Sequence, residues 1–165
     1  MLRQLARTNN SETLKLAYYA LVEAHIRYGI EVWGTCSASN MGRVLKKQKK
    51  AVRLVVGAHY LESCRPIFKQ QEILTAPSLY ILQSALRVHA ALDTYRRRDD
   101  VHQHQTRGSH QLLIPPHHKR SPKYCAAICY NHLSADLKQL GSLKNFKTCL
   151  TNHLKQTAPY TVPGL

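Results

Sequence analysis

Carboxylates are scarce in this chain: its 165 residues include nine Asp and Glu against 24 Lys and Arg, which gives a formal charge of +15. No two of the nine have a spacing suited to general acid–base work, which argues against carboxylate-driven catalysis. Asp99 and Asp100 are adjacent, as in a two-metal polymerase site, but they follow three arginines instead of aromatic and apolar strand residues. We therefore expect them to lie in a solvated loop with local ion pairs.

Three other features are absent. No run of 18 apolar residues occurs, so we expect no membrane span and no membrane partner. The seven glycines are scattered and form no phosphate-binding loop, and the first residues hold no apolar stretch long enough for a secretion signal. Five cysteines at irregular spacing do not form a disulfide framework, which favours a reducing, intracellular setting.

Positive charge is the dominant feature of the sequence. Residues 1–60 carry a net +7, residues 61–100 a net +1 and residues 101–165 a net +7. Cations placed on phosphates release condensed counterions, so RNA or DNA is the expected partner. With 44% hydrophobic residues, the chain is too apolar for a disordered basic tail and can bury one core or two small ones.

Apolar periodicity and capping residues predict an all-α fold of about six helices. The expected helices cover 12–33, 41–56, 67–71, 77 to about 93, 122 to about 133 and from 143 onward. Ser11 is expected to cap the first of them, and Ser39 or Asn40 the second, which Gly57 ends. A short turn capped by Ser134 precedes the last helix. A long loop over 96–119, with at most one short strand at 112–114, separates a 1–95 helical region from a 120–158 helical region and a 159–165 tail that is loose or strapped across the surface.

The predicted helix 41–56 separates into two faces. Its apolar arc holds Met41, Val44, Leu45, Ala51, Val52 and Val55, and the opposite arc holds six cations, Arg43, Lys46, Lys47, Lys49, Lys50 and Arg53. We predict that these six contact a phosphate backbone; the alternative is a solvated outer face. Residues 46–50 also resemble a nuclear-import tract, although such tracts act in flexible segments. Gln48 lies in the apolar arc and is expected to need a buried hydrogen-bond partner.

Soft ligands near the C-terminus allow a second hypothesis. Cys125, Cys129 and His132, with Cys149 and His153 downstream, could form a tetrahedral zinc site, but their spacing differs from the common fingers. On a helix the first three share one face with Ile128, which favours ordinary core packing. The aromatic residues Tyr18, Tyr19, Tyr28 and Trp33 could stack on bases, yet they lie in the most apolar helix, so core packing is expected for most of them.

Residues 14–34 and 45–53 resemble the region just after the polymerase domain in reverse transcriptases of LINE-type, jockey-like non-long-terminal-repeat retrotransposons. The most specific matches are Tyr28-Gly29-Ile30, Val32-Trp33-Gly34 and the stretch from Gln48 to Arg53. Further matches lie at 66–69, 73–74, 79–83, 106–107, 121–124, 130–133 and 146–147, so that nearly the whole chain is covered.

The resemblance implies the C-terminal, thumb-side helices of an RNA-directed DNA polymerase that acts in the nucleus. The palm, with its aromatic-x-Asp-Asp motif, has no counterpart here, so no catalytic residue and no cofactor is expected in this chain, and whether it belongs to an enzyme is left open. Template and primer, together with the missing polymerase domain, are the implied partners. The alternatives are a noncatalytic protein-interaction or structural helical module, and a decayed transposon remnant without activity.

Overall fold

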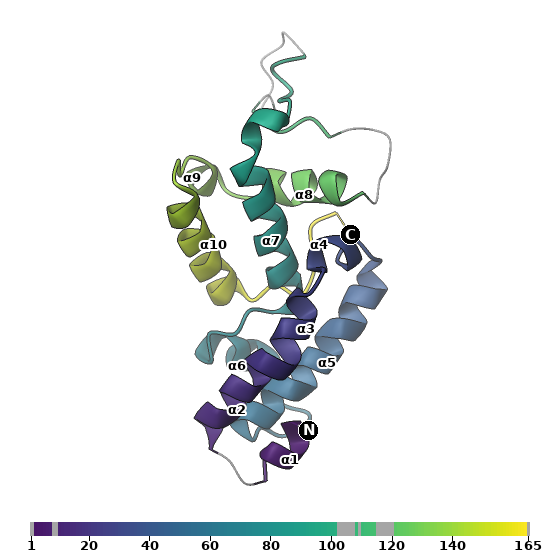
Figure 1. Ribbon diagram of the computed structural model, residues 1–165, viewed down its shortest axis with the longest axis vertical. Helices are drawn as coiled ribbons and strands as arrows, with labels where there is room; N and C mark the ends of the chain where they lie inside the picture. The colour runs from purple at the N-terminus through teal and green to yellow at the C-terminus, as the bar shows by residue number, and fades with distance from the viewer. Residues whose placement is uncertain (1, 8–9, 102–107, 109, 115–120, 165) are drawn as a thin grey trace.

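Thr75 begins the most buried helix of the molecule. Its side-chain oxygen accepts a hydrogen bond from the Ser78 backbone N–H (3.1 Å), and Pro77 fits the first helical turn. In the computed structural model, which describes residues 2–7, 10–101, 108, 110–114 and 121–164, this helix is α7, Ala76–Ala90. Because α4, α5, α8 and α10 all pack on α7, residues 76–82 are buried on every side, beyond the single stripe that periodicity predicts (Figure 1).

The predicted all-α fold is confirmed. Over the described residues the regular structure is helical, apart from one isolated antiparallel bridge between Arg97 and Leu112. This bridge lies where the short strand at 112–114 was expected. Of the predicted 96–119 loop, residues 102–107, 109 and 115–119 lie outside the described residues. No helix in the described part of the chain is long and apolar enough to cross a bilayer.

The single helix predicted over 12–33 is wrong. Its place is taken by α2 (Ser11–Tyr18), a π-helical segment (Tyr19–Glu23), α3 (Ala24–Arg27) and α4 (Ile30–Trp33). Gly29 separates α3 from α4 because its φ of 59° is left-handed, a conformation that glycine adopts without a steric penalty. The N-cap of α2 is Asn10 instead of Ser11, since the Asn10 side chain accepts the Thr13 N–H at 2.9 Å.

The next helices begin earlier than predicted. The long helix α5 covers Ala38–Val56 and begins before the predicted residue 41, because Ser37 is its N-cap. The helix α6 covers Cys64–Gln70, with Ser63 as its N-cap, and starts three residues before the predicted position. A short helix, α1 (Leu2–Leu5), was not predicted, and the helix predicted from 77 to about 93 ends at Ala90, with a 3-10 turn at Leu92–Thr94 after it.

The C-terminal helices follow the predicted starts closely. Ser121 caps α8 (Pro122–Asn131), Ser134 precedes the short α9 (Ala135–Lys138), and Ser142 precedes α10 (Leu143–Thr157). On α10 the predicted apolar face is buried at Phe146, Leu150 and Leu154, whereas Leu143 is 45% exposed. The tail is strapped across the surface: the Thr75 hydroxyl donates to the Pro159 carbonyl at 2.6 Å, and Ala158 and Val162 are buried.

Two adjoining hydrophobic clusters form the core. The larger one combines residues of α7, α8 and α10 with Ile26, Ile30 and Met41, and therefore joins the helical regions on both sides of 96–119. The smaller one is built from α2, α5 and α6, and it includes Tyr18, Val52, Phe68 and the tail residue Ala158. The 120–158 region thus shares a core with the first 95 residues, and α5 extends along both clusters.

Candidate nucleic-acid interface

The long helix α5 presents its cations on the side opposite its buried face. Its start is fixed by the Ser37 side chain, which accepts the Asn40 N–H (3.4 Å), and its end by Gly57 in a left-handed conformation. The predicted apolar arc is largely buried, with Met41, Leu45 and Val52 between 0 and 4% exposed. At 100° per residue, the buried arc centres directly opposite the cationic arc, so packing of the apolar side chains directs the cations to the surface.

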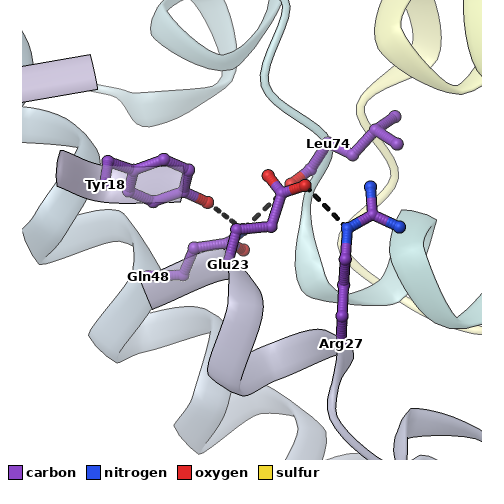
Figure 2. Close-up of polar contacts among 5 residues, drawn as sticks. All are labelled: Tyr18, Glu23, Arg27, Gln48 and Leu74. Atoms are coloured by element: carbon purple, nitrogen blue, oxygen red, sulfur yellow. Dashed lines mark hydrogen bonds and ion pairs between the residues drawn. The ribbon is translucent and has the colours of Figure 1, made fainter. Parts of the chain in front are cut away.

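Gln48 forms hydrogen bonds within the core that fix the rotation of α5 about its own axis. Figure 2 shows those that it makes with Tyr18 and Leu74. Its side-chain amide donates to the Tyr18 hydroxyl at 2.8 Å and to the Leu74 carbonyl at 2.9 Å. The side-chain oxygen Oε1 of Gln48 accepts a hydrogen bond from the Ala76 backbone N–H at 2.7 Å. The expectation that Gln48 needs a buried partner is confirmed, and the three bonds join α5 to α2 and to the start of α7. Burial also raises the pKa of Tyr18, which keeps its hydroxyl protonated.

A buried carboxylate lies beside this polar cluster. Glu23, on the π-helical segment, is 6% exposed and accepts a 2.8 Å hydrogen bond from the Nε of Arg27 (Figure 2). The pair links the π-helical segment to α3, and the widened π turn joins α2 to α3. The negative charge of Glu23 is therefore paired with Arg27 and not with a cation of α5.

The six predicted cations divide into two groups. Arg43, Lys46, Lys47 and Lys50 are exposed and occupy the centre of the outward arc. Lys49 and Arg53 are half-buried at one border of it and contact the protein itself: the Lys49 Nζ lies 3.7 Å from the centroid of the Tyr160 ring, and Arg53 donates to the Glu62 carbonyl. We call the four exposed residues the basic stripe. It is the part of the predicted site that the structure leaves open to a ligand.

No carboxylate of α5 opposes the basic stripe, because the sequence contains no Asp or Glu between Glu31 and Glu62. The ion pairs of the described residues lie elsewhere and include Glu31 with Arg87 and Glu72 with Lys155. Burial lowers the pKa of Lys49, and the neighbouring Arg53 and Arg65 lower it further. None of the ion pairs among the described residues involves the basic stripe, and unpaired positive charge of this kind attracts polyanions in general.

The residues that could form the zinc site differ in how deeply they are buried. Cys125 and Cys129 are buried in the larger cluster, and burial raises the pKa of the Cys129 thiol to about 12. His132 is exposed, and its Nδ1 lies 2.9 Å from the Ile128 carbonyl oxygen. Among the residues that the structure describes, no three His, Cys, Asp or Glu side chains gather in a way that could hold a metal ion.

This burial predicts the reactivity of the thiols in the folded protein. A thiol reagent such as dithionitrobenzoate should label Cys149 within minutes, because Cys149 is exposed, and should leave Cys64, Cys125 and Cys129 unlabelled until urea unfolds the chain. Counting labelled cysteines by mass spectrometry before and after unfolding checks this, with Cys149→Ser as the control that removes the fast signal. Fast labelling of Cys125 or Cys129 in native protein would contradict the described packing.

Asp99 and Asp100 lie in a surface loop with local partners, as expected. The Asp100 carboxylate accepts the Arg97 backbone N–H at 2.7 Å, and the Asp99 carboxylate lies 3.2 Å from Nδ1 of His110. Each acid therefore has its own nearby partner, and both are exposed. This arrangement fits a solvated loop, which was the favoured interpretation of the Asp-Asp pair.

The aromatic residues of the N-terminal helices differ from one another in exposure. Tyr18 is fully buried and Trp33 is half-buried against the larger cluster, whereas Tyr19 is 37% and Tyr28 86% exposed. Two of the four residues therefore pack in the core, and the expectation that most of them do is wrong. Tyr28 extends into solvent because it occupies the turn before Gly29, where the helix breaks. Another exposed ring, Tyr60, lies just after α5. It belongs to no periodic pattern and could be found in the sequence only by its position in the turn after Gly57.

Comparison of the chain with protein-family models, with curated proteins and with solved structures finds no match. The interface is therefore interpreted from its own geometry and charge.

Proposed function

We propose that the chain binds RNA or DNA through the phosphate backbone, using the basic stripe of α5, and that it is the noncatalytic C-terminal portion of a non-long-terminal-repeat retrotransposon reverse transcriptase. One observation carries the binding proposal: four exposed cations lie opposite a buried arc on a helix whose rotation is fixed by Gln48. Side chains held on one face can meet successive phosphates without a conformational rearrangement. The resemblance of residues 14–34 and 45–53 supports the assignment to a reverse transcriptase, which acts in the nucleus.

A matched pair of double variants tests the stripe. Lys47→Glu with Lys50→Glu reverses two stripe charges three residues apart, and Lys144→Glu with Lys147→Glu reverses two exposed charges of the same spacing on α10. Both variants lower the formal charge from +15 to +11. We expect the α5 variant to bind an RNA–DNA hybrid about 100-fold more weakly at 100 mM salt and to reduce the slope of log K against log salt by about 2.

The α10 variant supplies the control for net charge. It should lose less than about tenfold in affinity and keep the salt slope, because only long-range attraction changes. Fluorescence anisotropy with a labelled hybrid measures both quantities, and circular dichroism verifies that both variants remain helical. Equal losses in the two variants would show that binding depends on overall charge alone and would refute the assignment to α5.

A second candidate function is supported by exposed apolar side chains in the segment that precedes α5. Leu16, Val32 and Tyr28 are each at least 70% exposed, and they lie on α2, on α4 and in the turn before α4. A helical interaction module would bury such side chains against a partner. Under this alternative the stripe is merely solvated, and the Lys47/Lys50 variant binds the hybrid as tightly as the parent chain.

A further inference from the structure

The turn that follows α5 exposes a tyrosine at the end of the helix. Gly57 ends α5, the Ala58 N–H bonds back to the Arg53 carbonyl at 3.0 Å, and the chain then runs through His59, Tyr60 and Leu61. Tyr60 and Leu61 are each 72% exposed. Neither side chain contributes to the two core clusters, so the fold gains nothing evident from their apolar surface.

This turn is fixed to α5 by an arginine of the cationic arc. The Nε and Nη2 atoms of Arg53 both donate to the Glu62 carbonyl, at 3.0 and 2.6 Å. The Glu62 N–H bonds to the His59 carbonyl at 3.0 Å, which closes the turn, and the His59 and Tyr60 ring centroids lie 4.7 Å apart. Arg53 therefore ties the backbone of the turn that carries Tyr60 to the border of the cationic arc, and the Tyr60 ring lies against the His59 imidazole.

We infer that the ligand of the basic stripe is a single strand of RNA or DNA, one base of which stacks on the Tyr60 ring; this rests on the proposed function. Tyrosine rings stack on unpaired bases of any sequence, whereas the bases of a blunt duplex are already stacked on one another. Phosphates along the strand would meet Arg43, Lys46, Lys47 and Lys50. Because Arg53 already holds the backbone of this turn, the turn loses little conformational entropy when the base binds.

An anionic membrane is the competing partner for cations beside exposed apolar side chains. A helix that binds in the membrane interface inserts its own apolar face among the lipids. In α5 that face is buried against α2, α6 and α7, with Val52 and Val55 at most 1% exposed. In the described turn that follows α5, Tyr60 and Leu61 offer only two exposed apolar side chains for insertion, so the structure favours the nucleic acid.

The test compares a labelled 15-nucleotide single-stranded RNA with a blunt 15-base-pair duplex on the full chain. Tyr60→Ala should weaken single-strand binding roughly 5- to 150-fold, the range for one stacked base, and leave the salt slope unchanged. Tyr60→Phe should restore the affinity to within about twofold, since it keeps the ring. Duplex binding should not respond to either variant. Tyr28→Ala, which removes a ring that is even more exposed, is the matched control and should leave single-strand binding unchanged.

Several outcomes would overturn the inference. The first is a Tyr60→Ala variant that binds the single strand as tightly as the parent chain. The second is a loss of affinity from Tyr28→Ala, or a loss of duplex affinity from Tyr60→Ala, as large as the loss of single-strand affinity from Tyr60→Ala. The third is tighter binding to vesicles of phosphatidylserine and phosphatidylcholine than to the single strand. Failure of the proposed function is distinguishable, because it leaves the Lys47/Lys50 variant equal to its α10 control. Single-strand binding that depends on Lys47 and Lys50 but not on Tyr60 refutes the stacking platform alone.

Discussion

Replacing Gln48 by Leu is expected to lower the free energy of unfolding by about 4 kcal/mol. The leucine fills a similar volume but leaves the Tyr18 hydroxyl, the Leu74 carbonyl and the Ala76 N–H without the partners that Gln48 supplies. Each buried polar group left unpaired costs roughly 1–3 kcal/mol. Since small domains are stable by about 5–15 kcal/mol, this loss is a large fraction of the total, and the variant should unfold at a clearly lower urea concentration.

Urea denaturation followed by circular dichroism measures this change. The matched control is Gln83→Leu on α7, which makes the same substitution at an exposed position and should change the free energy of unfolding by less than about 0.5 kcal/mol. A loss below about 1 kcal/mol in Gln48→Leu would mean that water or a rearranged backbone satisfies the three groups. The fixed rotation of α5, and with it the direction of the basic stripe, would then need another explanation.

Replacing Gly34 by Ala should lower the free energy of unfolding by about 3 kcal/mol. A Cβ atom at this position would overlap the Tyr80 ring and the Ile30 carbonyl oxygen. Tyr80 is fully buried at the centre of α7, so its ring has no space into which it can move. The close approach explains in physical terms why glycine follows Val32-Trp33 in this chain: it allows the segment after α4 to lie directly on α7.

A second glycine supplies the control for this substitution. Gly42 lies on α5, and a Cβ added there meets no neighbouring atom. Gly42→Ala should therefore raise the free energy of unfolding by about 0.5–1 kcal/mol, because alanine loses less conformational entropy in a helix. Thermal or urea unfolding of the two alanine variants side by side should shift in opposite directions. A Gly34→Ala variant as stable as the parent chain would contradict the described contact with Tyr80.

Much of the secondary structure could be predicted from local signals. Ser121, Gly57 and Pro77 mark helix ends at or near the observed positions, since capping and backbone restrictions act over only a few residues. The break at Tyr28–Gly29 was missed because apolar spacing continues across it, whereas the left-handed Gly29 separates α4 from the helical segments before it. The same break explains why Tyr28 is exposed in a segment that otherwise contributes to the core.

The candidate site was only partly predictable. Helical periodicity identified the cationic arc, but it could not show which of the six cations stay exposed. Lys49 and Arg53 are distinguished by Tyr160 and Glu62, which approach α5 from elsewhere in the chain. No pattern within residues 41–56 contains that information. The exposed Tyr60 was missed for a similar reason: an aromatic residue in a turn has no periodicity that reports its surroundings.

The sequence by itself determined that the chain is helical, that α5 has one apolar and one basic side, and that Gln48 needs buried partners. These properties depend on residues within a few turns of one another. Only the tertiary structure decided that the partners are Tyr18, Leu74 and Ala76, that four of the six cations stay exposed, and that Arg53 holds the turn that carries Tyr60. The reason is physical: each of these contacts joins separate elements, and packing of the whole chain chooses which elements meet.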